Sequence, residues 1–65
     1  MKITVNGNPE TIEACSIADY LAGRGLAGEG VVVEYNYQIV KRAEWPQVKL
    51  RENDKLEVLS FVGGG

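Results

Sequence analysis

The sequence predicts a small α+β domain in which one helix packs against a sheet. Three observations predict it. Polar and apolar residues alternate at the start of the chain, as in a half-buried strand, and the periodicity of a short helix follows Ser16. The end of the chain is an apolar segment of strand length, residues 55–62. The composition, 45% hydrophobic and 25% charged over 65 residues, is typical of one globular domain.

A β-hairpin is predicted at the start of the chain. Residues 2–5 alternate polar and apolar side chains, which is the period of a strand with one buried face. Asn6 and Gly7 follow, and both tolerate the positive φ that a type I′ turn requires. We expect the second strand at residues 10–13, with Pro9 at its start, where a missing N–H is tolerated.

A short helix is predicted after the hairpin. Ser16 suits the N-cap, because its hydroxyl can accept a free backbone N–H of the first turn. The apolar residues that recur at helical spacing form one stripe, namely Ile17, Tyr20 and Leu21. Gly23 and Gly25 are expected to end the helix, and Arg24 suits the negative pole of its last turn.

Glycines and β-branched residues then organise the middle of the chain. The four glycines within residues 23–30 predict a surface loop, because no strand precedes them and no Lys-Ser or Lys-Thr follows as in a nucleotide site. Residues 31–35 predict an internal strand and residues 38–40 a short one. Residues 42–45 are expected to form an irregular turn that Pro46 stops.

The last strand completes the predicted fold. A polar turn at residues 51–54 precedes it, and the strand itself covers residues 55–62. A hairpin, one main helix on one face and a final strand describe a β-grasp fold with a mixed sheet of four to five strands. Spacing alone leaves other α+β arrangements open. We expect residues 1–62 to form the single domain and residues 63–65 a flexible glycine tail.

Composition excludes several kinds of function. The net charge is −2 and the basic residues are scattered, which argues against nucleic acid or an anionic membrane as a partner. The chain has no His and no paired Cys, so it lacks the usual general base and metal ligands, and we expect no metal site. We interpret Cys15 as a small packing residue rather than a redox or acyl-transfer site. The missing disulfides and the absence of a signal peptide favour the cytoplasm.

The glycine tail is the best candidate for a chemical group. Gly63, Gly64 and Gly65 have no Cβ, so they can pass through a narrow channel, and three extended residues reach roughly 10 Å. An α-carboxylate has a pKa near 3.5 and is a poor electrophile at neutral pH. ATP can activate the Gly65 carboxylate as an acyl-adenylate, and a sulfur nucleophile can convert that into a thiocarboxylate.

The final strand carries apolar residues on both faces. By simple alternation Leu56 and Val58 share one face, and Leu59 and Phe61 share the other. If the first pair meets the helix, then Leu59 and Phe61 form an exposed patch beside the tail. Exposed apolar patches usually mark partner sites, so we expect Leu59, Phe61, Gly63 and Gly64 to contact a partner. A β-bulge in the strand would turn the two side chains inward instead.

Residues 33–45 resemble the thiamine-biosynthesis sulfur carriers that share the name ThiS. The family pattern is an apolar strand, Asn, two variable residues, two apolar residues, Pro-Arg, two variable residues and Trp. The residues of this chain that match it are Asn36, Ile39, Val40, Arg42 and Trp45. Lys41 replaces the usual proline, while Gly64 and Gly65 match the terminal pair and Gly63 a preceding small residue. The resemblance covers essentially the whole chain.

The resemblance implies a ubiquitin-like β-grasp fold and a defined reaction cycle. An E1-like adenylyltransferase of the ThiF type uses ATP and Mg²⁺ to activate Gly65, and sulfur then converts it to the thiocarboxylate. A thiazole synthase of the ThiG type takes that sulfur to build the thiazole of thiamine. The chain would bind no cofactor itself, would be a cosubstrate rather than an enzyme, and would be a monomer when free.

Alternative functions remain open at this point. Another sulfur carrier could serve molybdopterin synthesis or tRNA thiolation, and a modifier or interaction module could share the fold. For Asn36, Arg42 and Trp45 we favour structural roles over partner contacts, since Asn suits a positive-φ turn and Trp usually buries its ring.

Overall fold

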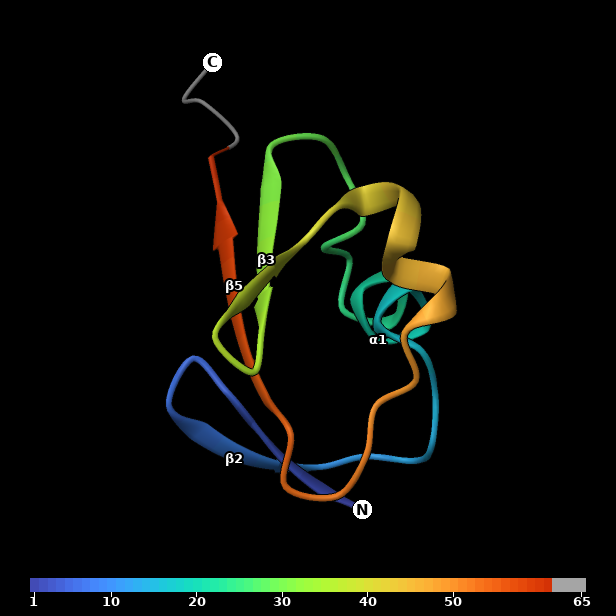
Figure 1. Ribbon diagram of the computed structural model, residues 1–65, viewed down its shortest axis with the longest axis vertical. Helices are drawn as coiled ribbons and strands as arrows, with labels where there is room; N and C mark the ends of the chain where they lie inside the picture. Colours follow the sequence, from blue (N-terminus) through green and yellow to red (C-terminus); the bar gives the residue numbers. More distant parts are fainter. Residues whose placement is uncertain (62–65) are drawn as a thin grey trace.

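The computed structural model describes residues 1–61. A twisted sheet forms one side of the molecule, and a short helix covers one of its faces (Figure 1). The elements follow in the order β1 (Lys2–Val5), β2 (Asn8–Thr11), α1 (Ile17–Gly23), β3 (Val31–Tyr35), β4 (Gln38–Val40), the 3₁₀-helix η1 (Arg42–Gln47) and β5 (Lys55–Ser60).

The five strands lie in the order β2-β1-β5-β3-β4. The first and last strands, β1 and β5, are neighbours in the middle of the sheet and run parallel. All other neighbours are antiparallel. This mixed sheet with one helix is the β-grasp arrangement that the element order predicted, and the α+β prediction is confirmed.

The first hairpin has the predicted turn but a different second strand. Asn6 and Gly7 both have positive φ, 51° and 84°, as in a type I′ turn. The expected strand at 10–13 is wrong, because the two-residue turn pairs Val5 with Asn8 and so starts β2 two residues earlier. Pro9 lies within this edge strand opposite Thr4. The ladder hydrogen bonds form at alternate pairs, and the pair of Thr4 and Pro9 is one without them. The missing N–H of Pro9 therefore removes no hydrogen bond from the ladder.

The helix starts as predicted and ends in a tighter motif than expected. Ser16 Oγ accepts the Asp19 N–H at 3.0 Å, which confirms the N-cap. At the other end Leu26 N–H donates to Leu21 C=O at 2.8 Å and Gly25 has φ 70°, the pattern of a Schellman motif. The role predicted for Arg24 is wrong, because it is the C-cap and its guanidinium bonds Glu10 instead of the helix end.

Two predictions in the second half of the chain are also corrected. Residues 42–47 form the 3₁₀-helix η1, and Pro46 lies inside it rather than stopping it. The φ that proline imposes suits a 3₁₀-helix, so only one hydrogen bond is lost. The final strand ends at Ser60, two residues earlier than predicted, and Val62 lies outside the described residues.

The core lies between the sheet, α1 and η1. Its buried members are Ile3, Val5, Ile17, Tyr20, Leu21, Val33, Trp45, Leu50, Leu56 and Val58. The stripe predicted on the helix and the inward residues of β5 are both part of it. Within residues 1–61, no helix has the length and apolar character needed to cross a bilayer, since α1 has seven residues and a span needs about 20.

Candidate functional site

The strand that leads to the glycine tail pairs with β3 up to its end, and with β1 only at Lys55 and Leu56. β5 pairs with β3 over five residues, from Tyr35 opposite Leu56 to Val31 opposite Ser60. The pairing continues beyond the strand, because Phe61 N–H donates to Gly30 C=O at 2.7 Å. The predicted tail residues Gly63, Gly64 and Gly65 lie outside the described residues. The last described residue before them is therefore fixed to the sheet.

The outward face of β5 is apolar near its end. Leu56 and Val58 are buried against the helix side, while Leu59 and Phe61 are 50% and 65% exposed. The strand alternates without a bulge, so the predicted division of its faces is confirmed. A partner can therefore reach Leu59 and Phe61 directly.

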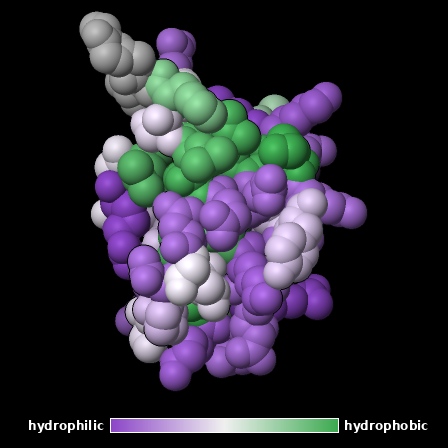
Figure 2. Space-filling view, turned by 90° about the vertical axis from the view of Figure 1, so that its left-hand side faces the viewer, coloured by the Kyte–Doolittle hydropathy of each residue, from purple (hydrophilic) through white to green (hydrophobic). Residues whose placement is uncertain are grey.

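Neighbouring strands enlarge this exposed surface. Val32 on β3 lies opposite Leu59, and Ile39 on β4, 62% exposed, lies opposite Glu34 on the same face. We call Val32, Ile39, Leu59 and Phe61 the apolar patch. Figure 2 shows this face, with hydrophobic residues gathered toward the end of β5 and hydrophilic ones over the rest.

The sequence reasoning missed Val32 and Ile39 as parts of a surface. One signal was available for Val32. Residues 31–33 are all valine, so a strand there must be apolar on its outward face as well as its inward face. The position of Ile39 depends on the register of β4 against β3, which the sequence alone does not show.

Asn36 has the structural role that we favoured. It sits in a turn with φ 49°, donates from Nδ2 to Asp54 at 3.2 Å and accepts the Lys55 N–H at 2.9 Å. Asp54 is buried and also accepts the Tyr35 hydroxyl at 2.8 Å. Burial, and then the bond to Asp54, raise the pKa of Tyr35. These contacts fix the β3–β4 turn to the start of β5.

Trp45 and Arg42 also make internal contacts. The Trp45 ring is buried and its Nε1 donates to Val40 C=O at 3.1 Å. The Arg42 guanidinium lies 5.3 Å from the Trp45 ring centroid and donates to the carbonyls of Ala27 and Gly28, the latter at 2.7 Å. Arg42 thus holds the glycine-rich loop against η1, and Trp45 ties η1 to the end of β4, in agreement with the structural roles favoured from the sequence.

Cys15 shows the properties of a packing residue. Its side chain is half-buried against the core. Burial raises the pKa of the Cys15 thiol, Asp19 raises it further, and Lys49 lowers it only partly. A thiolate is the reactive form, so this environment makes the thiol less reactive. The alternative of an activated cysteine is not supported.

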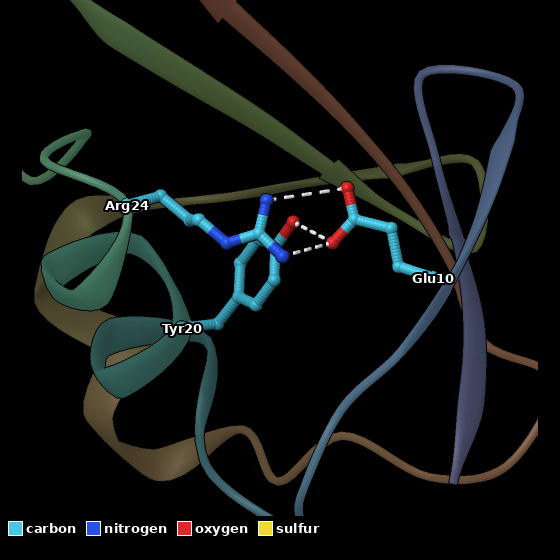
Figure 3. Close-up of polar contacts among 3 residues, drawn as sticks. All are labelled: Glu10, Tyr20 and Arg24. Atoms are coloured by element: carbon cyan, nitrogen blue, oxygen red, sulfur yellow. Dashed lines mark hydrogen bonds and ion pairs between the residues drawn. The ribbon is translucent and has the colours of Figure 1, made fainter.

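A polar cluster joins α1 to the edge strand β2 (Figure 3). The Tyr20 hydroxyl donates to the Glu10 carboxylate at 2.7 Å, and the Arg24 guanidinium bonds the same carboxylate. Arg24 also stacks over the Tyr20 ring at 4.9 Å. Burial, then the bond to Glu10, raise the pKa of Tyr20 to about 12. The cluster therefore ties the helix to the edge of the sheet.

Residues 1–61 contain no pocket and no group of three potential metal ligands. The apolar patch is therefore the main surface feature of the part of the chain that the structure describes. Exposed apolar patches of this kind usually mark sites that contact another macromolecule.

Three comparisons place the chain among known proteins. A family model described as the ThiS family matches residues 3–65. Sulfur carrier protein ThiS of Bacillus subtilis is 38% identical over 50 residues, which cover 77% of this chain and 76% of that protein. The crystal structure of a thiamine biosynthesis protein (ThiS) from Geobacter metallireducens has a TM-score of 0.85 at 33% identity, with both chains covered completely.

A longer relative is similar over the whole chain. Thiazole synthase of Magnetococcus marinus is 44% identical over 66 residues, which cover 100% of this chain and 20% of that protein. The chain thus spans about a fifth of the length of the thiazole synthases that it matches. The family model nonetheless covers nearly every residue, and the fold agrees with it, so the chain belongs to the ThiS family.

Proposed function

We propose that this chain is a sulfur carrier that supplies sulfur for the thiazole of thiamine. The observation that carries the proposal is the ThiS family match over residues 3–65. It is supported by the likeness to a protein named sulfur carrier over three quarters of both chains. We expect the carrier to work in the cytoplasm, as a cosubstrate and not as a catalyst.

The proposed chemistry takes place at Gly65. An adenylyltransferase of the ThiF type transfers AMP from ATP, with Mg²⁺, to the Gly65 carboxylate and releases pyrophosphate. A sulfur nucleophile then attacks the acyl carbon and AMP leaves, so that one carboxylate oxygen is replaced by sulfur. The domain binds no cofactor in this scheme. Its part is to present the glycine tail from a strand that is fixed up to Phe61.

The sulfur is proposed to go to a thiazole synthase of the ThiG type. Similarity to a segment of proteins named thiazole synthase supports this choice over molybdopterin synthesis or tRNA thiolation. We propose that Leu59 and Phe61 contact the partner enzymes, and that Gly63 and Gly64 pass into their active sites. The exposure of both apolar side chains next to the tail supports that contact.

The test is thiocarboxylate formation on the 65-residue chain. Incubation with the adenylyltransferase from the same organism, ATP, Mg²⁺ and a sulfur source should produce the mass gain of one oxygen-to-sulfur exchange. Fragmentation should locate the sulfur on Gly65, and Cys15→Ala should be loaded as well as the wild type. Sulfur found on Cys15 would contradict the proposal. Amide bonds to lysines of other proteins would instead indicate a modifier.

A further inference from the structure

Two glutamates occupy directly opposed positions of the sheet beside the apolar patch. The register places Glu34 on β3 directly opposite Glu57 on β5, and Ile39 on β4 directly opposite Glu34. Neither carboxylate makes an ion pair or a hydrogen bond with any residue in 1–61. Like charges at directly opposed positions of a sheet destabilise it. The isolated domain therefore carries an electrostatic cost at this place without an internal contact that offsets it.

The cation of β5 on the same face, Lys55, does not pair with these acids. Lys55 lies two residues before Glu57 on β5, so its side chain points to the same face. Its ammonium group donates to the Tyr37 hydroxyl at 3.0 Å and lies 5.5 Å from the Tyr37 ring centroid. The positive charge is thus held at the β3–β4 turn, away from the end of the strand where the apolar patch lies.

We infer that this face docks onto a protein surface that has an apolar centre and an Arg or Lys directed at Glu34 and Glu57. The inference rests on the proposed function and assigns the docked surface to the enzyme that adenylates Gly65. The apolar patch supplies the contact area, and the two carboxylates select a partner of opposite charge. The partner's cation would also remove the repulsion between the two acids.

The charges of this face argue against other occupants. A second copy seated face to face would bring two more carboxylates, while the Lys55 ammonium of that copy is held at its own Tyr37. An anionic membrane would be repelled by Glu34 and Glu57. A protein with a basic side chain beside apolar ones is the occupant that fits both features.

The experiment compares two variants with the same net charge. Glu34→Gln with Glu57→Gln neutralises the acid pair, and Glu13→Gln with Asp19→Asn neutralises two exposed acids away from this face. The dissociation constant for the adenylyltransferase should be measured by calorimetry at low and high salt, and the melting temperature of each variant by circular dichroism. Loading of wild-type Gly65 is measured in parallel by mass spectrometry.

We expect the Glu34/Glu57 variant to bind on the order of tenfold more weakly at low salt, with a smaller salt dependence than the wild type. Its melting temperature should equal or exceed that of the wild type, and the control pair should bind normally. If the wild type is loaded but both variants bind alike, this inference fails and the proposed function stands. If the wild type is not loaded, both fail. The inference would also be overturned if the chain dimerised through this face and the Gln substitutions made that dimer more stable.

Discussion

The Asn6 side chain takes the place of a strand residue beside Val58. Its Oδ1 accepts the Val58 N–H at 2.7 Å, and its Nδ2 donates to the Val58 C=O at 3.2 Å. β1 ends at Val5, so its backbone does not reach Val58. Without the Asn6 amide, the Val58 backbone would have no hydrogen-bond partner on that side of β5. One turn residue thus shapes the first hairpin and also extends the support of the strand that leads to the tail.

Asn6→Gly should therefore destabilise the domain by about 1–2 kcal/mol, since glycine keeps the positive φ of the turn but removes both hydrogen bonds. Urea unfolding measures the loss. Asn53→Gly is the matched control, because Asn53 also has positive φ, 72°, and its side chain bonds no residue in the described range. Equal stability of the two variants would show that the Asn6 amide contributes little.

Tyr20 should make the stability of the domain fall at high pH. The unfolded side chain titrates near pH 10 and the folded one near 12, so the folded state binds the phenol proton more tightly. This stabilisation is fully present below pH 10 and is lost as the pH rises through about 12. In Tyr20→Phe the free energy of unfolding should decline less steeply over that pH range. Urea unfolding at each pH measures this decline.

The comparison variant is Tyr37→Phe, which removes the hydroxyl of an exposed turn tyrosine and its hydrogen bond from Lys55. That variant should keep the part of the decline that Tyr20 causes, because the bond from Tyr20 to Glu10 is unchanged. A decline of equal steepness in Tyr20→Phe would show that another group causes it. Loss of the phenolate absorbance step near pH 12 in Tyr20→Phe alone would assign the titration to this residue.

Features that depend on adjacent residues were predictable from the sequence. The type I′ turn follows from Asn6 and Gly7, and the helix N-cap from Ser16, because each conformation is decided within three or four residues. Arg24 was misassigned because its partner Glu10 is 14 residues away, while the helix end is adjacent. Distant contacts of this kind have no signal in local spacing.

In the candidate site too, features set by adjacent residues were predictable and features set by distant contacts were not. Alternation within one strand places Leu59 and Phe61 on its outward face, and the structure confirms their exposure. The register between three strands decides that Glu34 lies opposite Glu57 and that Ile39 belongs to the apolar patch. Since the connections between those strands differ in length and form, the register could not be derived from the residues alone.

Deleting Gly64 and Gly65 should abolish loading and leave the melting temperature nearly unchanged. Two extended residues span about 7 Å, so the new terminus would fall short of the adenylating site, while glycine has no side chain to bury. The shortened chain should still compete with the wild type for the enzyme, because the apolar patch is intact. Failure to compete, or a large drop in melting temperature, would show that these glycines contribute to docking or to folding.

Leu59→Ser combined with Phe61→Ser should weaken enzyme binding far more than folding. Both side chains are at least half exposed, so polar replacement at each should change stability by about 0.5 kcal/mol or less. At the centre of an interface, each apolar anchor can cost about 2 kcal/mol or more when truncated. Calorimetric affinity and urea unfolding should be measured on the same preparation of the variant.

Leu56→Ser gives the matched contrast on the same strand. Leu56 is fully buried against the helix side, so serine there removes core contacts and leaves a hydroxyl in an apolar site. This variant should lose several kcal/mol of stability, on the order of the 2–5 kcal/mol seen for large-to-small core substitutions. Its folded fraction should still bind the enzyme normally, because the outward face is unchanged. If instead the Leu59/Phe61 variant unfolds and its folded fraction binds normally, the two residues stabilise the domain and the partner enzymes dock on another face.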